Sequence, residues 1–275
     1  MRRFLIYIVK RLLLNPNLVG WGILYILFWG SIGAYLMAPS FIKQIPTAYI
    51  SKVYQSYVAS WYADLVTLSL SALAVSVAFM LFYQTGTLPY LFRYSRLKES
   101  TYIVSVYSGT LIAGLAIELS LTGLISVIFS NNGIGITIYP HEFYILIPFI
   151  LLANLFFISL STFLVLLTIK FNGMRVQNLI SFTPLVLGFL FYSLFTFSEY
   201  PKTLDYTSPY LSLILLLYYG YSGNTPPANL QNPQSSASLE LVIISSILWV
   251  LILTLANIIL IRRIYFTNIE ESKQL

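Results

Sequence analysis

The sequence predicts an all-α integral membrane protein with six transmembrane helices, an amino-terminal interfacial helix and a short embedded segment between the last two spans. Three observations carry this prediction: the composition, the long apolar runs and the distribution of basic residues. The chain has 275 residues, of which 58% are hydrophobic and 9% are charged, and its mean hydropathy is +0.81. Soluble globular proteins carry about 25% charged residues. This chain therefore has too few charges for a soluble surface, and too much apolar mass for disorder.

Six apolar runs are long enough to cross a bilayer, which requires about 20 apolar residues per helix. They lie near residues 18–37, 64–83, 101–130, 144–169, 178–197 and 241–261. Charged residues, Pro or Gly bound these runs. A seventh run, Leu211–Tyr221, is too short to cross and is typical of a re-entrant or interfacial segment. We expect a single transmembrane domain over residues 1–275.

The 15 Lys and Arg residues are distributed unevenly between alternate connecting segments. Twelve lie in the amino-terminal segment, the connections after the second and fourth spans and the carboxyl-terminal tail, and three lie in the other connections. The positive-inside rule places the basic side in the cytoplasm. We therefore expect a multi-pass protein of the cell membrane with both termini in the cytoplasm. An odd number of spans would break this pattern.

Residues 1–16 are predicted to form an amphipathic helix in the cytoplasmic interface. One side of the helix is basic and carries Arg3, Tyr7, Lys10 and Arg11. The opposite side is apolar and carries Leu5, Ile8, Val9 and Leu12. Asn15-Pro16 should break the helix before the first span. The alternative is a charged start to one long first helix.

The residues that catalysis requires are missing. The one histidine, His141, has no second histidine or cysteine to complete a metal site, because the chain contains no cysteine. There is no G-x-x-x-x-G-K-[ST] and no G-x-S-x-G motif. The spans also offer neither a nucleophile with a base nor paired carboxylates. We expect no enzyme activity, no cofactor or metal on this chain, and no nucleic-acid partner.

The connection after the second span, Gln84–Ser100, is predicted to form a short amphipathic helix just outside the membrane. Gly86 can end the span, and Thr87 is a plausible helix N-cap. Apolar side chains follow at i, i+3 and i+4, namely Leu88, Leu91 and Phe92. The basic side chains are Arg93, Arg96 and Lys98. Such a helix can dock into a groove on a partner protein or rest on anionic headgroups, and these residues fit both alternatives.

The same connection resembles the type-2 family of ATP-binding-cassette (ABC) transporter permeases. The resemblance rests on the order G-T-L-x-x-L, a following Ser-Arg pair and a polar start to the next span, carried by Gly86, Thr87, Leu88, Leu91, Ser95 and Arg96. In that family this loop is the coupling helix that contacts the ATPase subunit. The interfacial helix, the six spans and the cytoplasmic termini also resemble the family. Leu211–Tyr221 would then belong to a re-entrant helical hairpin between spans 5 and 6, where Ser208-Pro209 replaces a common Asn-Pro.

The resemblance implies that the chain is the membrane-spanning permease subunit of an ABC exporter and forms half of a translocation pathway. ATP and Mg would bind to a separate ATPase subunit, and a second copy or a similar permease would complete the pathway in the bilayer. The implied ATPase-coupling residues are Gly86, Thr87, Leu88, Leu91, Phe92, Arg93, Ser95 and Arg96. Two alternatives remain open. One is a non-transporting scaffold or assembly subunit, and the other is an ion-coupled carrier or intramembrane enzyme.

Glu118 lies near the middle of the third span, where a carboxylate is costly and indicates function. Small and polar residues at steps of four place it on one helix face, which we name the polar stripe: Thr110, Gly114, Glu118 and Thr122. Such a face normally contacts other helices or a water-filled path. Glu118 is therefore a candidate residue of the translocation path. The alternative is a packing role, in which it is protonated or bonded to Asn154 or Ser161.

Two further predictions concern the outer side. Asp64 lies at the start of the second apolar run and is predicted to sit at the interface. The segment Ser222–Glu240 is rich in Pro, Asn, Gln and Ser, and it is predicted to be a flexible, exposed loop.

Overall fold

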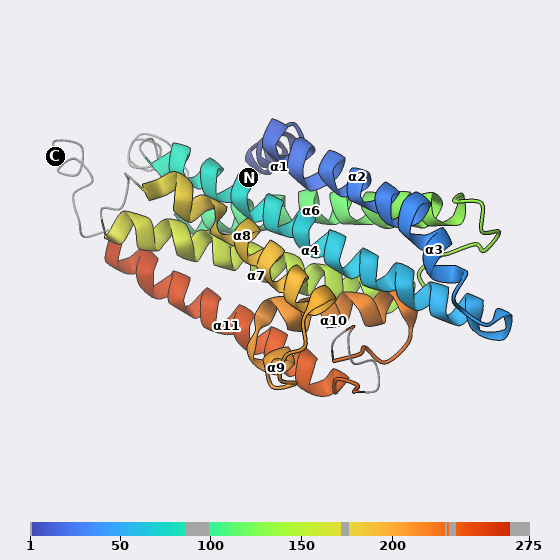
Figure 1. Ribbon diagram of the computed structural model, residues 1–275. Helices are drawn as coiled ribbons and strands as arrows, with labels where there is room; N and C mark the ends of the chain where they lie inside the picture. Colours follow the sequence, from blue (N-terminus) through green and yellow to red (C-terminus); the bar gives the residue numbers. More distant parts are fainter. Residues whose placement is uncertain (1, 86–98, 172–175, 229, 231–234, 265–275) are drawn as a thin grey trace.

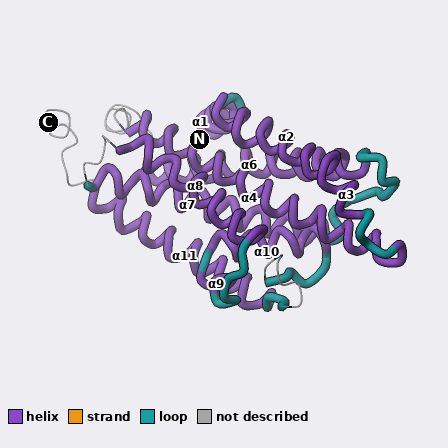
Figure 2. The backbone as a smooth tube through the Cα atoms, in the orientation of Figure 1, coloured by secondary structure: helices purple, strands orange, loops and turns teal. Residues whose placement is uncertain are grey.

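The computed structural model describes residues 2–85, 99–171, 176–228, 230 and 235–264, and these residues are mostly helical (Figures 1 and 2). The β pairing in the described part is an isolated bridge between Pro227 and Ser236. The α-helices are α1 (Arg2–Leu13), α2 (Tyr25–Ser31), α3 (Ala38–Ile42), α4 (Ile50–Thr85), α6 (Glu99–Ser130), α7 (Phe143–Lys170), α8 (Gln177–Phe197), α9 (Leu204–Thr207), α10 (Pro209–Ser222) and α11 (Leu239–Ile264). Two π-helical stretches, η1 (Leu18–Leu24) and η2 (Ile32–Met37), flank α2, and η3 (Thr47–Tyr49) is a 3-10 turn.

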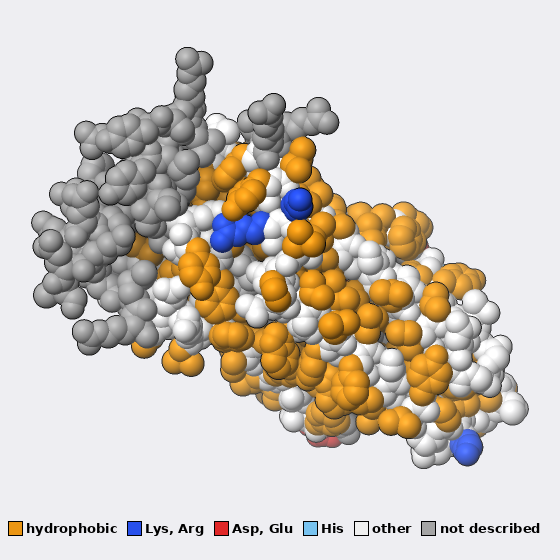
Figure 3. All heavy atoms as spheres, turned by 90° about the horizontal axis from the view of Figure 1, so that it is seen from above, with side chains coloured by type: hydrophobic (Ala, Val, Ile, Leu, Met, Phe, Trp, Pro, Cys, Tyr) orange, Lys and Arg blue, Asp and Glu red, His pale blue; other side chains and the backbone are white. Residues whose placement is uncertain are grey.

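Six helical stretches are long and apolar enough to cross a membrane, so the chain is an all-α, multi-pass membrane protein. They are Leu18–Ile42, Thr47–Gln84, Thr101–Ser130, Phe143–Lys170, Gln177–Phe197 and Leu239–Ile261. The long helices run along a common direction in Figure 1. In Figure 3, hydrophobic side chains are spread over the visible face of the described residues, and Lys and Arg appear at few places. Such a surface suits a hydrocarbon solvent.

Helix α4 is the centre of the bundle. In the most apolar stretch of its span 94% of the residues are buried, whereas the corresponding share in the other five spans is between 28% and 56%. It packs against α7, α8, α10 and η1. Because α4 is enclosed by protein, its polar side chains meet other helices. The outer helices expose their apolar side chains instead.

The helices of the third to sixth candidate spans begin and end within about two residues of the expected bounds, and the second differs from the expectation at its start. The helix begins at Ile50, well before the expected start at Asp64. Asp64 lies inside this helix and is only 3% exposed, so its side chain faces protein. The stretch before Asp64 is rich in Tyr, Ser and Ala. It is helical because it packs against protein, including a hydrogen bond from the Tyr54 hydroxyl to the Phe129 carbonyl at 2.8 Å.

The predicted break after the amino-terminal helix is confirmed. Helix α1 ends at Leu13, and Asn15 lies outside any helix. The Oδ1 atom of Asn15 accepts a hydrogen bond from the backbone N–H of Asn17 at 3.0 Å, which stabilises the turn. The apolar side of α1 packs against α6, with Ile8 and Leu12 fully or almost fully buried.

The segment between α8 and α11 is packed into the bundle. Helix α10 has 14 residues, and nearly all of them are buried. It packs against α4, α7 and α11. The prediction of an exposed loop from Ser222 onward is wrong at its start, because Ser222 ends α10 and is only 4% exposed. Ala228 and Ala237, farther along the same segment, are also buried.

Candidate functional site

The sequence points to two sites, of which the first lies outside the described residues. The residues predicted to couple to an ATPase, Gly86, Thr87, Leu88, Leu91, Phe92, Arg93, Ser95 and Arg96, belong to the connection 86–98, which the structure does not describe. Its flanks are described. Helix α4 ends at Thr85 and α6 begins at Glu99.

Helix α1 packs against the first turns of α6. The rings of Phe4 and Tyr102 have their centroids 5.6 Å apart, and Tyr102 lies in the first turn of α6. Two turns farther along α6, Gly109 lies against Ile8. The amphipathic helix therefore packs beside the start of α6, the span that follows residues 86–98 in the chain.

The second site is the polar stripe, and the structure turns all of it inward. Thr110 and Glu118 have no exposed surface, and Thr122 is 2% exposed. Gly114 is buried as well. The stripe faces α4 and α7, so within this chain it contacts other helices, one of the two expected surroundings.

Glu118 is bound by α4, not by α7. The Ser69 hydroxyl donates a hydrogen bond to Oε1 of Glu118 at 2.9 Å, and Oε2 has no partner among the described residues. Neither predicted partner bonds to it. Ser161 donates to the Ala74 carbonyl at 2.7 Å, and Asn154 packs against Gly114. Sequence spacing placed Glu118 on a face, but the order in which neighbouring helices pack decided its partner.

Asn154 of α7 packs closely against Gly114 of α6. A Cβ atom at Gly114 would lie 2.7 Å from both Cγ and Nδ2 of Asn154, and it would also overlap Oδ1. Both polar atoms of the Asn154 amide lack a hydrogen-bond partner within the described residues. The absence of a side chain at Gly114 therefore makes room for a buried amide beside Glu118.

Hydroxyl groups connect the stripe to α10. The hydroxyls of Tyr62 and Thr122 are 2.9 Å apart, and the Thr122 hydroxyl donates to the Glu118 carbonyl at 2.7 Å. The rings of Tyr62 and Tyr221 stack with centroids 4.4 Å apart. The Tyr221 hydroxyl is 2.7 Å from that of Ser126, one turn beyond Thr122. Polar side chains thus continue from Glu118 towards the connection between α6 and α7.

Two buried carboxyl groups were missed as site residues. Oδ2 of Asp64 accepts a hydrogen bond from the Thr196 hydroxyl at 3.2 Å. Asp205, in α9, has no exposed surface, and the Tyr200 hydroxyl, which donates to the Ala228 carbonyl at 2.6 Å, lies near its carboxyl group. Burial raises the pKa of Asp205 to about 7, because it outweighs the opposite effects of the nearby Tyr200 hydroxyl and the Lys202 ammonium, which lower this pKa.

No group of three or more His, Cys, Asp or Glu side chains suited to a metal gathers within the described residues. His141 is largely exposed, with Nε2 3.9 Å from the Glu142 carboxylate. The chemistry of the described interior is therefore that of isolated buried acids, hydroxyls and amides between helices.

Comparisons of this chain with models of protein families, with curated proteins and with solved structures found no match.

Proposed function

We propose that the chain is the membrane-spanning permease subunit of an ABC-type exporter, forming half of a translocation pathway driven by a separate ATPase subunit. The observation that carries the proposal is that α4 and α6, the spans on either side of residues 86–98, contact each other and that the amphipathic α1 packs against the start of α6. The sequence of residues 86–98 carries the G-T-L-x-x-L order.

The charge distribution supports an orientation for this arrangement. The connection 86–98 contains Arg93, Arg96 and Lys98, and α1 carries Lys10 and Arg11. The positive-inside rule places this end in the cytoplasm of a cell membrane, where an ATPase would have access to ATP. In this orientation α1 lies in the cytoplasmic interface.

The packing of α10 supports a re-entrant hairpin of α9 and α10. The Tyr210 hydroxyl donates to the carbonyl of Pro184, inside α8, at 2.9 Å. At the other end, the Tyr221 carbonyl accepts from the backbone N–H of His141 at 2.9 Å. Fourteen helical residues span about 21 Å, which is shorter than a hydrocarbon core of about 30 Å. The segment thus enters the bundle and returns to the outer side.

The proposed mechanism divides the work between two kinds of subunit. The ATPase subunits bind ATP and Mg and close on each other, and the coupling helix transmits this motion to the bundle. A second copy of the chain, or a similar permease, supplies the other half of the pathway. Rigid-body movement of the two halves then alternates access, as in other packed helical transporters. The polar stripe around Glu118 is buried within each half, so its proposed role as a polar lining requires α6 to separate from α4 and α7 during transport.

Co-purification tests the proposal. The chain is co-expressed with an ABC-type ATPase from the same genome, chosen from a neighbouring reading frame where one is present, and the tagged permease is isolated in mild detergent. We expect the ATPase to co-purify with the unaltered chain and to be lost with Leu91→Asp and with Arg93→Glu. Lys43→Glu, a matched charge reversal at an exposed position between the first two spans, should retain the ATPase.

The result that would refute the coupling-helix assignment is equal recovery of the ATPase with all three variants. Failure of the unaltered chain to bind any ATPase would instead favour the alternative function, a non-transporting scaffold or assembly subunit. Recovery of folded permease, measured by size-exclusion chromatography, distinguishes lost binding from lost folding.

A further inference from the structure

A cleft of about 550 Å³ opens where α1 meets the first span, between that turn, α4 and α8. This volume lies within the range of ligand pockets, about 300–1,000 Å³. We name it the α1 cleft. Its lining residues are Arg11, Leu12, Leu14, Asn15, Pro16, Asn17, Phe79, Met80, Tyr83, Asn178 and Phe182.

The lining of the α1 cleft divides into a polar part and an apolar part. Arg11 supplies a positive charge, and Asn15, Asn17 and Asn178 supply amide groups. The guanidinium of Arg11 is oriented by a hydrogen bond from Nη1 to the Tyr7 hydroxyl at 3.2 Å. The cleft therefore presents a guanidinium cation beside amide donors, which suits an anion.

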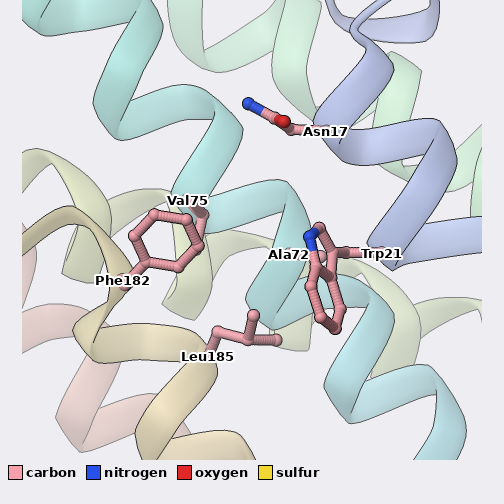
Figure 4. Close-up of a pocket in the computed structure, with 6 residues that line it drawn as sticks. All are labelled: Asn17, Trp21, Ala72, Val75, Phe182 and Leu185. Carbon is pink, nitrogen blue, oxygen red and sulfur yellow. The ribbon is translucent and has the colours of Figure 1, made fainter. Parts of the chain in front are cut away.

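The apolar part continues along the seam between the first span, α4 and α8. A second, smaller hollow of about 10 Å³ shares Asn17 and Phe182 with the cleft. Figure 4 shows Asn17 and Trp21 on one helix, Ala72 and Val75 on the second, and Phe182 and Leu185 on the third. Apart from Asn17, every side chain that lines this hollow is apolar or aromatic. The lining thus changes from polar at Arg11 to apolar at Leu185, with Asn17 and Phe182 common to the cleft and the hollow.

We propose that the α1 cleft binds one phospholipid with an anionic headgroup from the surrounding leaflet, with an acyl chain lying along the seam past Trp21. The charged and amide side chains match the headgroup, and the apolar side chains match the acyl chain. A phosphate would meet Arg11 and the amides, and the chain would meet Phe182 and Leu185. The seam is open to the bilayer, because 45% of Trp21 is exposed. The inference does not depend on the proposed transport function.

Quenching of Trp21 fluorescence provides the test. Trp29, Trp61 and Trp249 are replaced by Phe, and the protein is reconstituted in phosphatidylcholine vesicles. Two matched series of vesicles contain increasing fractions of either dibrominated phosphatidylglycerol or dibrominated phosphatidylcholine. Bulk contact quenches Trp21 equally in both series. A bound anionic lipid should make half-maximal quenching by phosphatidylglycerol occur at a roughly fivefold lower fraction, the preference that one basic side chain confers.

Matched charge reversals assign the preference to the cleft. Arg11→Glu should abolish it. Lys10→Glu makes the same change in net charge at an adjacent exposed position that does not line the cleft, and it should retain the preference. A chain with Trp249 as its only tryptophan, on α11, should show no headgroup preference. Equal quenching by both lipids at Trp21, or equal loss with both reversals, would overturn the proposal.

A second measurement avoids the tryptophan replacements. Native mass spectrometry of the otherwise unaltered chain should show one retained phosphatidylglycerol per chain after release from mixed vesicles. Arg11→Glu should reduce this retention about fivefold relative to Lys10→Glu. Retention of phosphatidylcholine to the same extent, or retention that is unaffected by Arg11→Glu, would contradict the assignment.

Discussion

Replacing Gly114 by Ala tests the packing around the candidate site. A Cβ atom at this position would lie 2.7 Å from two atoms of Asn154, whereas carbon atoms in contact are normally about 3.5–4.0 Å apart. The helices or the Asn154 side chain must therefore shift by about 1 Å. Overpacking of this kind costs about 1–3 kcal/mol, and the better helix propensity of Ala returns about 1 kcal/mol.

Gly123 provides a matched control on the same helix. A Cβ atom there would meet nothing within 4 Å, so Gly123→Ala should keep only the propensity gain. We expect Gly114→Ala to be less stable than Gly123→Ala by about 1–3 kcal/mol. Adding Asn154→Ala removes the obstructing amide, so the double variant should be more stable than the sum of the single changes predicts, with coupling of about 0.5–3 kcal/mol.

The assay is unfolding of the purified protein in mixed micelles with increasing sodium dodecyl sulfate, followed by tryptophan fluorescence and far-UV circular dichroism. Equal midpoints for Gly114→Ala and Gly123→Ala would refute the close approach of α6 and α7. Strict additivity of the Gly114 and Asn154 changes would refute the contact between these two residues.

Three other outcomes follow from the structure. Ser69→Ala should lower the free energy of unfolding by about 0.6–1.7 kcal/mol, the range for hydrogen bonds between helices in membranes, and no loss in the same unfolding assay would argue against the 2.9 Å bond to Glu118. Because burial raises the pKa of Asp205 from 3.8 to about 7, the folded state holds a proton that the unfolded state has lost, so stability should fall as pH rises through this window. The melting temperature, measured from pH 3.8 to about 7, should depend less on pH in Asp205→Asn than in the unaltered chain. Glu240→Gln, which alters an exposed carboxylate, should keep the original pH dependence. An unchanged pH dependence in Asp205→Asn would refute the burial of Asp205. Single cysteines at Lys43 and Thr225, introduced into a chain that has none, should react with an impermeant maleimide from outside, while one at Arg96 should not; the reverse pattern would overturn the orientation.

The spans whose bounds the sequence predicted best are those in which the apolar run ends at charged residues, Pro or Gly. The third span, for example, was expected over residues 101–130, and α6 covers Glu99–Ser130. The start of the second span was predicted too late because hydropathy identifies only helix segments apolar enough to contact lipid. The residues from Ile50 to Ala63 are more polar than such a segment, yet they belong to α4, and most of them from Tyr54 onward are buried against other parts of the protein.

The polar stripe was predictable as a face, and its contacts were not. The spacing of four residues is enough to align Thr110, Gly114, Glu118 and Thr122 on α6. The partner of Glu118 depends on which helix packs opposite, and α4 brings Ser69 to it. The burial of Asp205 could not be predicted from the sequence, because the nearby charged residues Glu199 and Lys202 make this segment look like a solvent-exposed connection. Its burial follows from the docking of α9, where the Ser212 hydroxyl donates to the Asp205 carbonyl at 2.7 Å.

Site-directed cross-linking tests the central claim, that a separate ATPase docks on the connection between α4 and α6. Single cysteines at Ser95 and Arg96, and at Lys43 and Ser236 as exposed controls, are introduced into the cysteine-free chain. Membranes containing the co-expressed ATPase are treated with a short bifunctional maleimide. The account predicts a permease–ATPase adduct from Ser95 and Arg96 and none from Lys43 or Ser236. Adducts from the control positions, or none from Ser95 and Arg96 while the ATPase co-purifies, would contradict it.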